Sequence, residues 1–282
     1  MWNLDDVRRF YAEEIRAVAN LRSEALVAAF AKVPRENFLG PGPWRIPNPG
    51  MGDRTTPDAD PAHLYHNVLV AIDESRQLNN GQPSFLAHSL EALELREGER
   101  VTHVGCGVGY YTAIIAEMVG VSGHVIGVEI DADLAARSRE NLAYLKQVEV
   151  WHGDGGECDP GGCDAIFVNA GVTHPKEIWL DSLRPGGRLL LYLTASFDAG
   201  NTGSGGVLLV KRIDHRYAAH FIGQVSVYHC AGARDEESSQ RLIEAFRSGR
   251  LFEAKSLRRE RHEPDDSCLL HHPNFCLSSS PL

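Results

Sequence analysis

Three glycines stand at alternate positions directly after a short apolar run. The stretch VTHVGCGVGYY covers residues 101–111 and carries Gly105, Gly107 and Gly109. Glycine permits backbone conformations and close ligand approach that a side chain would block. Where such a turn joins a buried strand to a helix, the free N–H groups of the helix N-terminus face the ligand. The stretch therefore predicts a ligand held by the backbone, although a plain tight turn has the same composition.

Two acidic residues stand at the ends of the next two expected strands. Glu129 ends HVIGVE, and Asp154 follows VEVWHG. A carboxylate about twenty residues after a glycine turn accepts hydrogen bonds from ribose hydroxyls in nucleotide sites. In methyltransferases an acid at the place of Asp154 accepts from the adenine amino group. The alternatives are a solvated strand end for Glu129 and ordinary Asp-Gly turn chemistry for Asp154.

Glycine spacing separates the two cofactor classes that use this geometry, dinucleotides and S-adenosyl-L-methionine (SAM). Dinucleotide sites favour G-x-G-x-x-G, and their third glycine would fall on Tyr110. The observed G-x-G-x-G resembles the turn of class I methyltransferases. In addition, GVLLVKRI and AHFIGQVSVYH have no helix between them, which predicts an antiparallel pair at the sheet edge. The combined pattern favours SAM, with S-adenosyl-L-homocysteine as its product.

The remaining segments supply the elements that must position these residues. From about residue 65 to 194, expected strands alternate with expected helices. This pattern predicts an α/β fold with a doubly wound, mostly parallel seven-stranded sheet of the Rossmann-like class I methyltransferase type. Residues 4–31 have the periodicity of amphipathic helix, and residues 39–62, rich in Pro, Gly and Asp, are expected to form a loop or flap. Tyr65 to Ile72 is expected to be a short strand.

Three segments are expected in the organisation of the chain: N-terminal helices and flap at 1–64, the methyltransferase core at 65–252, and a mobile tail at 253–282. The 282 residues carry a net charge of −10, which argues against nucleic acid as a partner. The six cysteines lack a disulfide-type spacing, and no signal peptide or membrane span is evident. These features predict a cytoplasmic protein with reduced thiols.

From about Leu21 to Gly232 the chain resembles the protein-L-isoaspartate O-methyltransferase family. The segments that carry the likeness are AFAKVPRENFL, LNNGQPSFLAHSLEAL, VTHVGCGVGYYTAIIAEMVG, GHVIGVEID, VEVWHGDGG, CDAIFVNAG and LDSLRPGGRLLLYL. The resemblance implies a SAM-dependent methyltransferase that acts on a carboxylate of a protein or peptide. It implies cofactor contacts at Leu78, Asn79, Asn80, Gly81, Gly105, Cys106, Gly107, Gly109, Glu129, Ile130, Asp154, Gly155 and Asn169.

The chain departs from the family in the loop before its first core helix. The family reads T-I-S-x-P there, and its serine helps to hold the isoaspartyl carboxylate, whereas this chain has Gly81 at the serine position. Asn79 and Asn80 either replace the hydroxyl as amide donors or only form the turn. The family also has an acid where this chain has His103. The alternatives are therefore another acceptor (a small molecule, a natural-product peptide or RNA) or a SAM-binding protein without catalysis.

Methyl transfer from a sulfonium to a carboxylate needs alignment rather than a base, because the nucleophile is already ionised. A hydroxyl or amine acceptor would need a base. The weak catalytic candidates follow the fourth strand and are Asn169 and His174, with Thr173 between them.

The tail carries residues of metal-ligand type at Cys268, His271, His272 and Cys276. Their spacing fits no standard zinc site, and the segment is expected to be mobile. The sequence expectation is therefore that the protein has no metal site.

Overall fold

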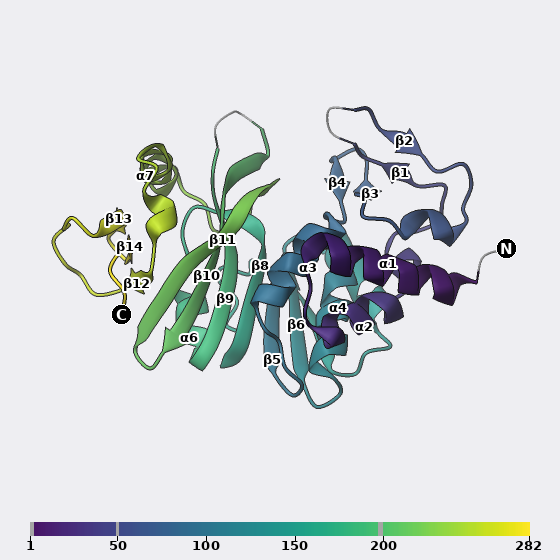
Figure 1. Ribbon diagram of the computed structural model, residues 1–282, viewed down its shortest axis with the longest axis horizontal. Coiled ribbons are helices and arrows are strands. Elements are labelled where there is room, and N and C mark those ends of the chain that lie inside the picture. Colours follow the sequence, from purple (N-terminus) through teal and green to yellow (C-terminus); the bar gives the residue numbers. More distant parts are fainter. Residues whose placement is uncertain (1–2, 49–50, 197–199) are drawn as a thin grey trace. The chain divides into compact units, whose positions relative to one another are not determined.

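The computed structural model describes residues 3–48, 51–196 and 200–282 (Figure 1). The chain forms two compact units. Residue 64 lies inside the first unit and residue 252 inside the second, so neither expected boundary is a limit of a unit. The first unit contains residues 1–98, 106–127 and 131–151, and the second contains residues 99–105, 128–130 and 152–282. Among the described residues, none of the helices is both long and apolar enough to cross a membrane.

The N-terminal helical stretch is two helices, α1 (Leu4–Ala19) and α2 (Glu24–Lys32). The side chain of Asn3 caps the start of α1, and Asn20 ends it in the left-handed conformation. The side chain of Ser23 then starts α2 by accepting from a backbone N–H in its first turn. Local capping residues therefore divide a periodicity that is continuous in the sequence.

The segment between α2 and the core differs from expectation. It contains two small antiparallel pairs and two 3-10 turns: β1 (Arg45–Ile46) with β2 (Arg54–Thr55), β3 (Ala71–Asp73) with β4 (Leu78–Asn79), η1 (Arg35–Phe38) and η2 (Pro61–Leu64). The expected strand at 65–72 is therefore wrong for most of its length. Two of its carbonyls, those of His66 and Val68, accept from the guanidinium of Arg35, which also binds the carbonyl of Leu64 just before it.

The core helices and strands follow the order that the sequence predicts. In chain order they are α3 (Pro83–Ala92), β5 (Arg100–Val104), α4 (Tyr110–Val119), β6 (His124–Glu129), α5 (Ala132–Leu142), β7 (Val148–His152), β8 (Cys163–Val172), α6 (Glu177–Ser182), β9 (Leu183–Ala195), β10 (Thr202–Ile213) and β11 (Arg216–Tyr228). β5, β8 and β9 pair in parallel, whereas β10 is antiparallel to both β9 and β11. The α/β class and the seven core strands β5–β11 are confirmed.

The C-terminal segment is folded, which corrects the expectation of a mobile tail at 253–282. After α7 (Glu236–Arg247) and η3 (Leu251–Glu253) come β12 (Ser256–Arg258), β13 (Cys268–His272) and β14 (Phe275–Ser278). They extend the sheet to ten strands in the order β13-β14-β12-β11-β10-β9-β8-β5-β6-β7, so β11 is not an edge (Figure 1). The tail stays in place because Phe275 and Leu277 are buried in the hydrophobic core of the second unit.

Candidate cofactor and acceptor site

The start of the glycine turn lies against the end of the neighbouring strand. Gly105 follows β5 with φ +75°, a conformation that favours glycine, and its N–H donates to the carbonyl of Val128 at 2.8 Å. A Cβ added at Gly105 would lie 3.3 Å from the backbone oxygen of Asn169 in β8. The structure thus brings Asn169 beside Gly105 at the carboxyl end of β5, where open α/β sheets bind ligands. Asn169 lies within β8 and not after it, which corrects the expectation for this residue.

The two acidic residues lie at the next strand ends of the second unit. Glu129 is buried at the end of β6, and its backbone carbonyl accepts from the N–H of Gly153 at 2.9 Å. Asp154 follows directly, at the carboxyl end of β7. Gly105, Glu129 and Asp154 therefore stand at the carboxyl ends of the adjacent strands β5, β6 and β7, and Asn169 of β8 lies beside Gly105. Ile130, next to Glu129, is largely exposed.

Asp154 makes the turn that its Asp-Gly sequence allows. Its Oδ1 accepts from the N–H of Gly156 at 2.7 Å. Gly232 packs directly on this carboxylate, because a Cβ at Gly232 would lie 1.9 Å from each carboxylate oxygen. The carbonyl of Gly155 accepts from the Trp179 indole at 2.7 Å, and this fixes the turn. A carboxylate has about four acceptor positions, so the turn leaves capacity for a ligand.

The rest of the glycine turn belongs to the first unit, and its glycines differ in role. Gly109 starts α4 with φ +92°, and a Cβ there would lie 2.8 Å from both Ser138 and Leu142 of α5. This glycine permits close helix packing. A Cβ at Gly107 would meet nothing within 4 Å, so Gly107 is the open position of the turn. Cys106 is buried, with its Sγ 3.7 Å from the Ser138 hydroxyl.

The two asparagines of the divergent loop support the backbone. The side-chain oxygen of Asn79 accepts from the N–H of Gly81 at 2.9 Å. The side-chain oxygen of the buried Asn80 accepts from the N–H of Val70 at 3.0 Å and from Arg35 at 3.1 Å. Leu78 lies in β4 just before them. The turn-forming alternative thus accounts for both side-chain oxygens.

Arg35 is a structural residue that sequence reasoning did not single out. Its side chain is fully buried and binds three backbone carbonyls of residues 64–68 together with Asn80. A buried guanidinium needs such a set of acceptors, since each unmatched N–H would cost hydration free energy. The sequence feature that could have pointed to Arg35 is its place in the family-like stretch AFAKVPRENFL, directly after a helix end. Arg35 therefore holds the segment that leads into the divergent loop.

His174 is engaged in a structural network. Its Nδ1 lies 3.0 Å from the Thr173 hydroxyl and 3.1 Å from Oδ2 of Asp235, the N-cap residue of α7. Its ring stacks parallel to that of His272 at 6.0 Å between centroids. Burial lowers the pKa of His174 below its usual value. These contacts tie the loop after β8 to α7, and they agree better with a positioning role than with a general base.

Arg234 is a second residue that sequence reasoning missed. It donates to the carbonyls of Gly171 at 3.0 Å and Thr194 at 3.1 Å, and to the hydroxyl of Ser196 at 2.9 Å. Desolvation lowers the pKa of this guanidinium, and no carboxylate of the described residues offsets that effect. A cation without a carboxylate partner thus stands at the carboxyl ends of β8 and β9. Such a position suits an anionic group of a substrate.

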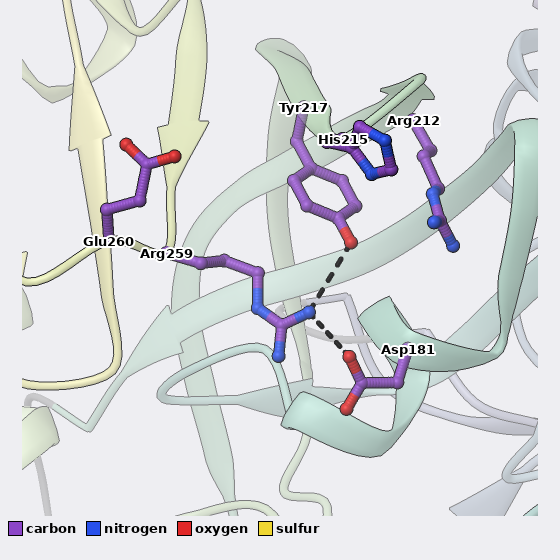
Figure 2. A pocket seen from close by; sticks show the side chains of 6 residues that line it. All are labelled: Asp181, Arg212, His215, Tyr217, Arg259 and Glu260. Atoms are coloured by element: carbon purple, nitrogen blue, oxygen red, sulfur yellow. Dashed lines mark hydrogen bonds and ion pairs between the residues drawn. The ribbon is translucent and has the colours of Figure 1, made fainter.

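A polar pocket lies elsewhere in the second unit, lined by Asp181, Arg212, His215, Tyr217, Arg259 and Glu260 (Figure 2). Figure 2 shows Arg259 pointing between Asp181 and the Tyr217 hydroxyl, to which it donates at 2.6 and 3.4 Å. The charge of Arg259 is already paired with that of Asp181, so we assign this pocket neither to the cofactor nor to the acceptor.

Residues 56–198 match the model of the protein-L-isoaspartate(D-aspartate) O-methyltransferase family. A relative of that name from Methanothrix thermoacetophila is 34% identical over 63% of this chain and 77% of its own length. A second from Archaeoglobus fulgidus is 32% identical over 66% of this chain and 78% of its own length.

Two solved structures share the fold. One, a protein-L-isoaspartate O-methyltransferase, has a TM-score of 0.65 at 22% identity and covers 85% of this chain and 69% of its own. Another, from Plasmodium falciparum, was assigned to the same enzyme and solved with S-adenosyl-L-homocysteine. It has a TM-score of 0.61 at 20% identity and covers 80% and 98%. The chain belongs to the protein-L-isoaspartate(D-aspartate) O-methyltransferase family of SAM-dependent methyltransferases.

Proposed function

We propose that this protein transfers the methyl group of SAM to a carboxylate of a protein or peptide. One observation carries the proposal: Gly105, Glu129 and Asp154 stand at the carboxyl ends of the adjacent strands β5, β6 and β7, and Asn169 of the neighbouring β8 lies beside Gly105. In an open α/β sheet this edge is the place of a nucleotide-like ligand.

The proposed cofactor contacts follow from the chemistry of each group. Glu129 accepts from the ribose hydroxyls, and Asp154 accepts from the adenine amino group with the capacity that its turn leaves. The open position at Gly107 lets the backbone approach the cofactor. The remaining contacts proposed from the family resemblance are Leu78, Asn79, Asn80, Gly81, Cys106, Gly109, Ile130, Gly155 and Asn169.

A carboxylate acceptor is supported by Arg234. A guanidinium binds a carboxylate through charge-assisted hydrogen bonds, which orient one oxygen for attack on the methyl carbon. The carboxylate displaces the sulfur in line, and S-adenosyl-L-homocysteine leaves with the electron pair of the broken bond. The nucleophile is ionised at neutral pH, so His174 is not needed as a base. Because the chain lacks the family serine, we propose Arg234 as a contact to the acceptor carboxylate.

An assay with labelled SAM and isoaspartyl, aspartyl and amidated peptides tests this function. We expect a base-labile methyl ester on a peptide with a free carboxylate. We expect none on the peptide whose carboxylates are all amidated. Arg234→Gln is expected to raise the KM for the acceptor about tenfold or more, since a hydrogen bond to a charged group contributes about 1.5–3 kcal/mol. The SAM dissociation constant is expected to stay unchanged.

Arg212→Gln is the matched control, because Arg212 also binds backbone carbonyls, those of Leu183 and Asp214. It is expected to leave both constants unchanged. Tight SAM binding without transfer to any peptide would refute the carboxylate proposal, and would favour a small-molecule or RNA acceptor or a non-catalytic SAM-binding protein. We also propose a cytoplasmic location, supported by six cysteines that are all free thiols.

A further inference from the structure

The folded C-terminal segment gathers four side chains of metal-ligand type. His262, Cys268, His271 and Cys276 each offer one ligand atom, and these four atoms all lie within 4.8 Å of one another. His262 lies in the connection between β12 and β13, Cys268 and His271 are in β13, and Cys276 is in β14. Both cysteines are free thiols. Residues at four separate points along the chain thus converge on one position.

The arrangement matches a tetrahedral zinc site. With Zn–S bonds of about 2.3 Å and Zn–N bonds of about 2.0 Å, ligand atoms around a tetrahedral zinc are separated by roughly 3.3–3.8 Å. The four ligand atoms already lie within 4.8 Å of one another, so only a small movement toward one another would let all of them coordinate the ion. Two thiolates and two imidazoles form the Cys2His2 set, which favours zinc over harder cations such as magnesium or calcium.

Contacts around the cluster orient its members. Nδ1 of His262 lies 2.9 Å from the backbone carbonyl of Glu260, and its Nε2 lies 3.4 Å from Sγ of Cys268. A ring N–H donated to a carbonyl leaves the other nitrogen as a metal ligand. The backbone N–H of Asp265 points to Sγ of Cys268 at 3.3 Å. Nδ1 of His271 is buried and has no hydrogen-bond partner among the described residues, and coordination to a metal would satisfy its lone pair.

Strand geometry decides which histidines belong to the cluster. His271 pairs with Cys276 across the β13–β14 ladder, so both side chains lie on the same face of the hairpin. His272, one residue later, points to the opposite face, where its Nε2 lies 3.2 Å from the Ser238 hydroxyl and its ring stacks on His174. His262 takes the place that sequence spacing would have given to His272.

We propose that His262, Cys268, His271 and Cys276 bind one zinc ion. Four protein ligands close the coordination sphere, so the zinc is structural and not catalytic. The ion joins the β13–β14 hairpin to the β12–β13 connection, whose other end is anchored by the Arg259–Asp181 ion pair (Figure 2). The hairpin in turn contacts α7 through the carbonyl of His271 and Arg241.

Metal analysis of the purified full-length chain tests this proposal. We expect one zinc per chain by inductively coupled plasma mass spectrometry, retained after gel filtration. Replacement by Co2+ is expected to give the visible d–d bands of a tetrahedral ion and a thiolate-to-cobalt charge-transfer band. Cys276→Ser and His262→Ala are expected to lose both the zinc and the cobalt spectrum. Cys158→Ser and His272→Ala, which change the same residue types outside the cluster, are expected to keep them.

Wild-type measurements keep the proposal testable even if the ligand variants fold poorly. Substoichiometric zinc in protein expressed with added zinc, together with no cobalt spectrum after titration of the reduced chain, would overturn it. A disulfide between Cys268 and Cys276 in freshly purified protein, detected by mass spectrometry without reductant, would also overturn it. Hydrogen exchange of residues 259–278 is expected to accelerate on chelation, which is a readout independent of methyl transfer.

Discussion

At the scale of single residues, the assignment of the cofactor depends most on Asp154. Its carboxylate already accepts one hydrogen bond within its own turn, from Gly156. The question is whether the remaining acceptor capacity binds an adenine amino group or only water. A substitution that keeps the turn and changes only this capacity can separate the two.

Asp154→Asn makes that separation. Its single side-chain oxygen can still accept from Gly156, while its amide N–H groups would face another donor, the adenine amino group. We expect SAM affinity to fall about tenfold or more by calorimetry, with unchanged thermal stability. The control is Asp159→Asn, because Asp159 accepts from the Gly161 N–H at 2.8 Å in a similar turn. Equal SAM affinity in the wild type and both variants would show that Asp154 only makes the turn.

At the scale of elements, the divergent loop is shaped by its backbone. Gly81 has φ +77°, and the hydroxyl of Tyr111 donates to its carbonyl at 3.4 Å. A Cβ at Gly81 would lie 3.0 Å from Leu86 of α3. The family serine therefore does not fit this position without local rearrangement.

Gly81→Ser is expected to lower the free energy of unfolding by about 1–2 kcal/mol, because an L-residue in the left-handed region costs roughly that much. Restoring the family residue is expected not to improve kcat/KM with an isoaspartyl peptide. Gly186→Ser isolates the backbone contribution, because Gly186 has φ +81° and its Cβ would meet nothing within 4 Å. If Gly81→Ser were as stable as the wild type and more active, the loop would adopt the family conformation. Urea unfolding and steady-state kinetics measure both effects.

Sequence periodicity predicted the core elements because each of them is defined by local signals. Gly105 and Glu129 could be placed at strand ends for the same reason, since apolar runs end directly before them. The hydrogen bonds of Arg35 and Arg234 to backbone carbonyls were not predictable from the sequence. The carbonyls belong to residues far along the chain, and any residue type could supply them. Gly109 packs α4 on α5, a role that glycine spacing does not distinguish from a cofactor contact, so its cofactor contact stays a prediction.

At the scale of the whole molecule, the structure of the tail was likewise not predictable from local sequence signals. Residues 253–282 lack strong local propensity, yet they complete the hydrophobic core of the second unit through β12–β14. Contacts of β12 with β11 and of β13 with α7 are among those that give them a defined structure. The proposed zinc site would add the free energy of metal binding to these contacts, and strand propensity does not include that contribution.

The stability of the molecule is expected to depend on pH through His103. Its side chain is fully buried in β5 and stacks on Phe167 at 5.0 Å between centroids. Burial lowers the pKa of His103 to about 3, whereas an unfolded chain has an ordinary value of about 6.5. Between these values the unfolded state binds the proton and the folded state does not. The contribution is therefore fully present above about pH 6.5 and is lost as the pH falls toward 3.

His103→Leu tests this linkage, because leucine has a similar volume and cannot be protonated. From pH 7 to pH 5 we expect the wild type to lose about 2 kcal/mol more of its free energy of unfolding than the variant. Urea titrations at both pH values measure the difference, and all other titrating groups cancel in the comparison. Parallel losses in the two proteins would mean that the folded state accepts a proton at His103. That would mean that burial does not keep the proton off the ring, against the desolvation from which the low pKa follows.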